Sequence, residues 1–106
     1  MATKARLLVF WDDPQDPAEF DRHYREVHIP LANKLPGLRR YTVIRNARPV
    51  RGGEPHYLIA ELDFDDMAAM KTALSSPEGQ AVGADGQLMA KTATMTNALC
   101  ELEDVF

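Results

Sequence analysis

Histidines and tyrosines near the start of this sequence are its best candidates for acid–base chemistry. His23, Tyr24 and His28 lie close together, and Tyr41 follows in the next predicted element. An imidazole can take up and return a proton near neutral pH, and a phenol can donate a hydrogen bond to a developing oxyanion. Tyr24 and Tyr41 are therefore either a pair of hydroxyl donors in one pocket with His28 or aromatic core residues whose hydroxyls reach surface partners.

His28 stands out because Pro30 follows it closely. Proline has no amide hydrogen and clashes with the preceding helical turn, so we expect a kink or a restart of the helix near residues 28–30. There the imidazole either reaches a pocket as a general acid or base, or bonds a backbone carbonyl freed by the kink. The spacing of the residues is compatible with both interpretations.

The histidine spacing argues against a metal site. His23 and His28 are five residues apart, which on an ideal helix is a rotation of about 500°, so their rings should point about 140° apart. A helical pair of zinc ligands needs positions i and i+4, and His56 is distant in sequence. The single cysteine, Cys100, excludes an intrachain disulfide and is expected to be an inert, small apolar residue.

The charge distribution suggests small ligands rather than nucleic acid. The net charge is −4, whereas nucleic-acid binders usually carry a basic excess. Residues 27–53 nevertheless hold six basic residues and no acidic one. This stretch is either a solvated strand face and loop or part of a site for an anionic small molecule. In the second case Arg39, on the same strand face as Tyr41, could pair with a substrate carboxylate.

The elements that must position these side chains form a single domain over residues 1–106. Apolar and alternating patterns predict strands at residues 5–11, 38–48, 56–64 and 92–105. Asp16 and Pro17 begin a helix that ends before Pro36-Gly37, and Asp65 or Asp66 caps a second one. Ser76 starts a short extra helix, and Gly79, Gly83 and Gly86 predict an irregular segment after it. The order βαββαβ predicts an α+β, ferredoxin-like four-stranded antiparallel sheet with the helices on one face.

The first predicted strand is apolar on both of its faces, and the helices can cover only one. A homodimer with its two sheets facing each other would cover the other face. Trp11 and Phe10, at the end of this strand, are candidate walls of a substrate pocket. The longest apolar run covers residues 7–11, far below a membrane span, and the N-terminal sequence has no signal-peptide pattern. We therefore expect a cytoplasmic protein with no membrane partner.

Three motifs resemble the EthD family: FDRHY at residues 20–24, HIPLA at residues 28–32 and LPGLRRY at residues 35–41. The strand from His56 to Phe64 and the Ser-Pro-Glu turn at residues 76–78 extend the resemblance over nearly the whole chain. It implies a dimeric α/β barrel, in which two ferredoxin-like protomers pack sheet to sheet. It also implies that His28 and Tyr41 occupy the positions of catalytic residues.

Two functional hypotheses follow from the residues and the resemblance. The first is a cofactor-independent enzyme that performs isomerase, dehydratase/cyclase or monooxygenase-type proton transfer on an aromatic, lactone or polyketide-like substrate. Its catalytic residues would be His28 and Tyr41, with Tyr24, Arg39, Trp11 and Phe10 binding the substrate. The second is a non-catalytic, ligand-binding or stress-type dimer with the same pocket. Haem binding, which related barrels show, is a third hypothesis. We predict that the protein uses no cofactor.

Overall fold

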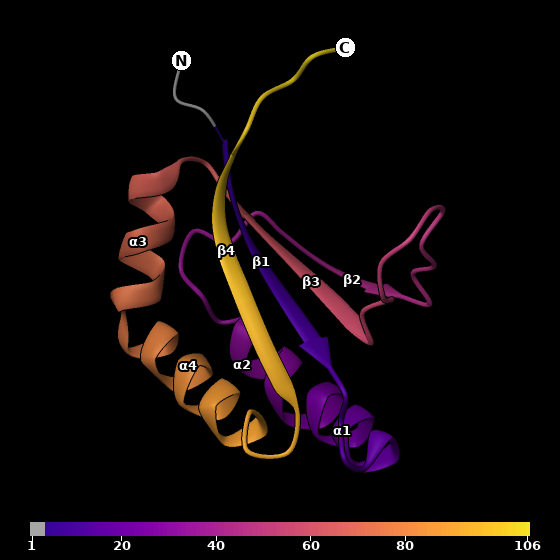
Figure 1. The fold of residues 1–106 in the computed structure, drawn as a ribbon. Coiled ribbons are helices and arrows are strands. Elements are labelled where there is room, and N and C mark those ends of the chain that lie inside the picture. The colour runs from indigo at the N-terminus through magenta and orange to yellow at the C-terminus, as the bar shows by residue number, and fades with distance from the viewer. Residues whose placement is uncertain (1–3) are drawn as a thin grey trace.

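The four strand segments pair into one antiparallel sheet in the computed structural model, which describes residues 4–106 (Figure 1). The strands are β1 (Lys4–Asp12), β2 (Arg40–Arg45), β3 (Leu58–Phe64) and β4 (Thr94–Leu102), in the spatial order β2-β3-β1-β4. All neighbouring strands are antiparallel. This is the predicted ferredoxin-like α+β fold. The strands β2, β3 and β4 are shorter than predicted because their outer residues belong to the adjoining loops.

Helices cover one face of this sheet. They are α1 (Pro17–His23), a π-helical turn η1 (Tyr24–His28), α2 (Ile29–Ala32), α3 (Met67–Ser75) and α4 (Pro77–Met89). The predicted caps are confirmed: the Asp16 side chain accepts from the Glu19 amide at 3.2 Å, and Asp66 accepts from the Ala69 amide at 2.7 Å. Over residues 4–106, no helix has the length and apolar character needed to cross a bilayer.

The first helical region departs from regular geometry one turn before the predicted position. Residues 17–32 form one continuous helical stretch, and the irregularity is η1, where the Ile29 amide donates to the Tyr24 carbonyl five residues back. Pro30 follows within α2 and has no amide hydrogen to donate. A π-helical turn inserts an extra residue into the helix, so it changes which side chains share a face.

The prediction of a short extra helix followed by an irregular segment was wrong. Helix α4 runs for 13 residues through all three glycines. Ser76 caps it by accepting from the Gly79 amide at 3.0 Å. A Cβ atom at Gly79 would lie 2.3 Å from the Ala73 carbonyl oxygen, so the absence of a side chain allows α4 to start directly against α3. At Gly79, close packing of the two helices outweighs the loss of helix propensity, about 1 kcal/mol relative to alanine.

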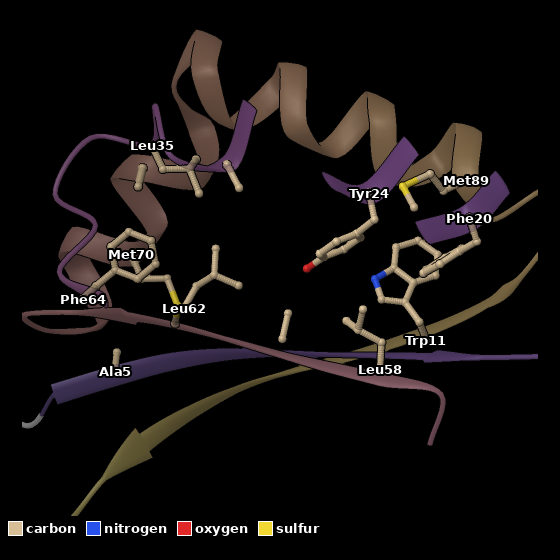
Figure 2. Close-up of a cluster of buried hydrophobic side chains, with 13 residues drawn as sticks. Ala5, Trp11, Phe20, Tyr24, Leu35, Leu58, Leu62, Phe64, Met70 and Met89 are labelled. Atoms are coloured by element: carbon tan, nitrogen blue, oxygen red, sulfur yellow. The ribbon is translucent and has the colours of Figure 1, made fainter. Parts of the chain in front are cut away.

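The hydrophobic core lies between the sheet and the helices (Figure 2). Residues of β3 alternate strictly between buried and half-buried, and the buried ones face the helices. The largest fully buried side chains in this layer are Trp11, Tyr24, Phe64, Leu58 and Met70. The opposite face of the sheet carries the intervening residues, and no helix of the described chain packs on it.

Candidate functional site

A cavity of about 330 Å³ lies between the sheet and the helices and opens to solvent beside the exposed residues Gln87, Asn97 and Leu99. Side chains from all four strands form its floor, and residues of η1, α2 and α4 form its roof. Gly79, Gly83 and Gly86 of α4 all border it, so part of the space exists because these positions have no side chain. The polar groups on its walls come from Trp11, Tyr24, His28, Tyr41, Gln87 and Asn97.

His28 is held in this wall by Asp85 of α4. The Nδ1 atom of His28 lies 2.8 Å from one carboxylate oxygen of Asp85, and the Nε2 atom of His23 lies 2.8 Å from the other. The side chains of His28 and Asp85 are only 12% and 8% exposed. One buried carboxylate thus accepts hydrogen bonds from two imidazoles, which fixes both rings.

The π-helical turn explains how two histidines five residues apart reach the same carboxylate. The expectation that their rings diverge assumed 3.6 residues per turn and was wrong. In a π-helical turn the hydrogen bond joins residues i and i+5, so side chains five apart lie one above the other. η1 therefore places His28 one turn beyond His23 on the face that meets Asp85.

The bond to Asp85 determines which nitrogen of His28 is available. A carboxylate only accepts, so Nδ1 carries the hydrogen and donates it. In the neutral ring Nε2 then keeps its lone pair, and it has no hydrogen-bond partner among residues 4–106. Burial lowers the pKa of His28, while Asp85 acts in the opposite direction. His28 is thus a neutral imidazole that lines the cavity with an unprotonated nitrogen.

Tyr24 and Tyr41 form the second polar feature of the cavity. Their hydroxyl oxygens lie 2.5 Å apart, and the Tyr24 ring stacks against the His28 ring at 5.2 Å between centroids. Burial raises the pKa of both phenols above the ordinary value, so both are protonated at neutral pH. Two O–H groups share one hydrogen bond, and one hydroxyl hydrogen is therefore left to donate elsewhere.

Trp11 supplies the third polar feature. Its Nε1 atom is fully buried and has no acceptor within residues 4–106. In Figure 2 this nitrogen and the Tyr24 hydroxyl are both directed into the space between the sheet and the helices. An unpaired buried donor costs about 1–3 kcal/mol, so a bound acceptor that displaces the side chains now covering this nitrogen would be stabilised there.

Four of the six predicted site residues, His28, Tyr41, Tyr24 and Trp11, come together around this cavity. Phe10 and Arg39 do not. Phe10 lies on the opposite face of the sheet, with its ring 4.7 Å from that of His56. Arg39 precedes β2, is mostly exposed and forms an ion pair with Asp65 at 2.8 Å.

Cys100 also lies outside the cavity, where its Sγ atom is 3.3 Å from the Arg6 carbonyl oxygen. Asp85 is the residue that the sequence analysis missed, and with it the contact that brings His23 and His28 together. Asp85 falls between glycines in the segment predicted to be irregular, so no pattern marked it as a partner for a histidine.

Comparison with known proteins places the chain in a family. Residues 12–93 match the EthD domain. An uncharacterized 11.0 kDa protein in the thcB-thcC intergenic region of Rhodococcus erythropolis is 36% identical over 81 residues, which cover 76% of this chain and 78% of that protein. The crystal structure of an EthD family protein from Bacillus halodurans C-125 is 32% identical, covers 90% of this chain and 96% of its own, and superimposes with a TM-score of 0.77.

A more distant likeness concerns the fold alone. SnoaB, a cofactor-independent oxygenase from Streptomyces nogalater, is 16% identical and superimposes with a TM-score of 0.70 over 99% of this chain and 98% of its own. The matched domain spans most of the chain, and the relatives from Rhodococcus and Bacillus extend the agreement to sequence and structure. The chain therefore belongs to the EthD family.

Proposed function

We propose that this protein is a small-molecule enzyme that transfers protons without a cofactor, with His28 as its base and the cavity as its substrate site. The observation that carries the proposal is the fixed orientation of His28. Asp85 accepts the hydrogen of His28 Nδ1, which leaves His28 Nε2 unprotonated. The lining of the same cavity includes Trp11, whose indole N–H is unpaired, and the tyrosine pair, which has one O–H free to donate. Aromatic, lactone or polyketide-like compounds with an acidic proton suit these walls.

The proposed step is a proton transfer followed by its return. His28 Nε2 takes a proton from an acidic C–H or O–H of the substrate, and the electron pair moves onto the neighbouring carbonyl oxygen. Trp11 and the tyrosine pair donate hydrogen bonds to that oxygen, while the Asp85 carboxylate stabilises the imidazolium. The imidazolium then returns the proton at another position of the same molecule, so the net reaction is an isomerisation. In an elimination, the imidazolium gives the proton instead to the leaving group, which departs as the new double bond forms. Positioned acid–base groups contribute about 10²–10⁴ in rate.

We also propose that two chains pair through their uncovered sheet faces. This face carries Leu8, Phe10, Ile44 and Ile59, all half-buried in the single chain. Arg6 lies among them and forms ion pairs with Glu61 at 2.7 Å and Asp63 at 2.6 Å. The arginine charge is therefore already paired when a second apolar sheet covers it, and the three side chains together keep one net negative charge. The cavities lie on the helical side of each sheet, so each protomer keeps its own site.

Hydrogen–deuterium exchange tests the proton transfer without knowledge of the product. The ketone β-tetralone, which has acidic C–H groups beside its carbonyl, is incubated with the protein in D₂O and followed by proton NMR. We expect the wild type to accelerate exchange and His28→Gln to lose the acceleration while still binding the ketone. His56→Gln is the matched control, because His56 also bonds a carboxylate, that of Asp12 at 3.0 Å, but lies outside the cavity.

Each result has a definite meaning. Exchange that depends on His28 and not on His56 supports the enzyme. Binding of β-tetralone with no acceleration of exchange by the wild type contradicts it and favours the non-catalytic binding protein. Equal acceleration by the wild type and His28→Gln would move the base to another residue.

A further inference from the structure

The walls of the cavity carry no formal charge at neutral pH. Among the residues of the described chain, 4–106, that line it there is no lysine, arginine, aspartate or glutamate. None of the basic residues that the described chain gathers between positions 27 and 53 lines the cavity: Arg39 pairs with Asp65, and Arg45, whose charge acts on the Tyr24 phenol from outside the wall, lies 3.6 Å from Asp21. Asp85 stands behind His28, with both oxygens already bonded to imidazoles.

This lack of charge excludes anionic ligands on energetic grounds. A carboxylate that enters an apolar cavity loses its hydration, and only a nearby cation with hydrogen bonds can compensate for that loss. Asp85 adds a negative charge just behind the wall, which opposes a second one. The neutral His28 cannot act as the missing cation unless it takes up a proton that burial disfavours.

The hydrogen-bonding groups on the walls define the ligand further. The Trp11 N–H is buried and without an acceptor in the described chain, and the tyrosine pair has one O–H to spare. His28 Nε2 is an acceptor. The remaining surface comes mainly from apolar side chains such as Leu7, Val9 and Leu62. The amides of Gln87 and Asn97 complete the lining, and both residues are exposed to solvent. A matching ligand is apolar over most of its surface, accepts at one oxygen and offers one acidic hydrogen nearby.

We propose that the cavity selects uncharged carbonyl compounds over their carboxylate analogues, with the carbonyl oxygen accepting from Trp11 Nε1. The size of the cavity agrees with a compound of one or two rings. Its 330 Å³ corresponds to about eleven water molecules at about 30 Å³ each and lies at the lower end of ligand pockets. This selectivity rests on the proposed function for the location of the site, but it does not require that the ligand reacts.

Three compounds of nearly equal shape separate charge from hydrogen bonding: β-tetralone, tetralin and 1,2,3,4-tetrahydronaphthalene-2-carboxylate. Dissociation constants are measured by calorimetry for the wild type and Trp11→Phe. We expect the ketone to bind the wild type at least tenfold more tightly than the carboxylate. We expect Trp11→Phe to weaken the ketone about fivefold to tenfold more than it weakens tetralin, because only the ketone loses a hydrogen bond. Tetralin thus corrects for the change in shape.

A second measurement needs no variant. Trp11 is the only tryptophan in the sequence, so its indole N–H gives one assignable peak in a proton–nitrogen correlation spectrum. We expect β-tetralone to shift this peak downfield and tetralin to leave it nearly in place. This result stands even if Trp11→Phe fails to fold.

The outcomes distinguish this inference from the proposed function. A carboxylate that binds as tightly as the ketone, or an indole peak that responds equally to ketone and tetralin, would overturn the inference. Selective ketone binding without catalysed exchange would support it and refute the enzyme. Binding of none of the three compounds would overturn both proposals, because both place the ligand in this cavity.

Discussion

Replacing Asp85 by asparagine tests the buried hydrogen bonds that orient His28. Asparagine has nearly the same shape, but it is uncharged and presents one acceptor and one donor group instead of two acceptor oxygens. His23 and His28 both donate to Asp85 at 2.8 Å, and Asp85 is 9% exposed. The substitution therefore weakens two buried contacts at once and leaves one imidazole facing an N–H₂ group.

The magnitude follows from those two contacts. A hydrogen bond to a charged group contributes about 1.5–3 kcal/mol to stability, and one between neutral groups about 0.5–1.5 kcal/mol. Two such replacements should lower the free energy of unfolding by about 2–3 kcal/mol. For a domain of this length, a change of that size lowers Tm by about 10 °C.

Asp65→Asn is the matched control for this measurement. Asp65 also accepts two hydrogen bonds from one partner, Arg39 at 3.0 and 2.8 Å, but both side chains are mostly exposed. Exposed ion pairs contribute little, so Tm should stay close to that of the wild type. Thermal unfolding is followed by circular dichroism at one protein concentration. A loss for Asp85→Asn no greater than that for Asp65→Asn would refute the structural role assigned to Asp85.

Three further predictions concern packing, pH and assembly. Gly79→Ala should lower the free energy of unfolding, measured with urea, by about 2–3 kcal/mol, because the new Cβ meets the Ala73 carbonyl oxygen at 2.3 Å. Gly83→Ala should raise it by about 0.5–1 kcal/mol, because the new Cβ meets nothing within 4 Å. Equal effects of the two substitutions would contradict the packing assigned to α4. Because burial lowers the pKa of His28, the unfolded chain takes up a proton on this ring at a higher pH than the folded chain does. The free energy of unfolding should therefore be at its full value above about pH 6.5 and fall as the pH drops below it. His28→Gln should flatten this fall, and an unchanged slope would show that His28 does not titrate in this way. Phe10→Asp should raise the dissociation constant of the dimer, measured by sedimentation velocity, at least about a hundredfold. Each buried Phe contributes about 1.5–3 kcal/mol, and a dimer buries two. A wild type that stays monomeric at high concentration would contradict the proposed pairing.

The fold followed from the sequence because its signals are local and agree with one another. The alternation from Leu58 to Phe64, the caps at Asp16 and Asp66 and the turn residues each specify one element, and their order allows few topologies. The structure, and not the alternation, places Trp11 and Tyr41 in the wall of one cavity. The length of helix α4 was missed because its glycines are poor helix formers, and contact with α3 explains only Gly79.

The site was predicted only in part because its geometry depends on contacts distant in sequence. His28, Tyr24 and Tyr41 could be selected by residue type and motif, and the structure places them around one cavity. Asp85 could not, because its role depends on how α4 lies across η1. The π-helical turn has no simple sequence signature, and without it the two histidines could not share a carboxylate. Arg39 and Phe10 were selected by strand parity and position, and both lie outside the cavity.

The protonation state of the His28 ring is the most direct test of the central claim that a bare imidazole nitrogen faces the cavity. Two-bond proton–nitrogen correlation spectra of nitrogen-labelled protein at pH 7.5 distinguish the two tautomers, and His28→Gln assigns the ring. We expect hydrogen on Nδ1, an unprotonated Nε2, and a shift of the Nε2 resonance when β-tetralone binds. A hydrogen on Nε2, or a ring that is fully protonated at this pH, would contradict His28 as the base.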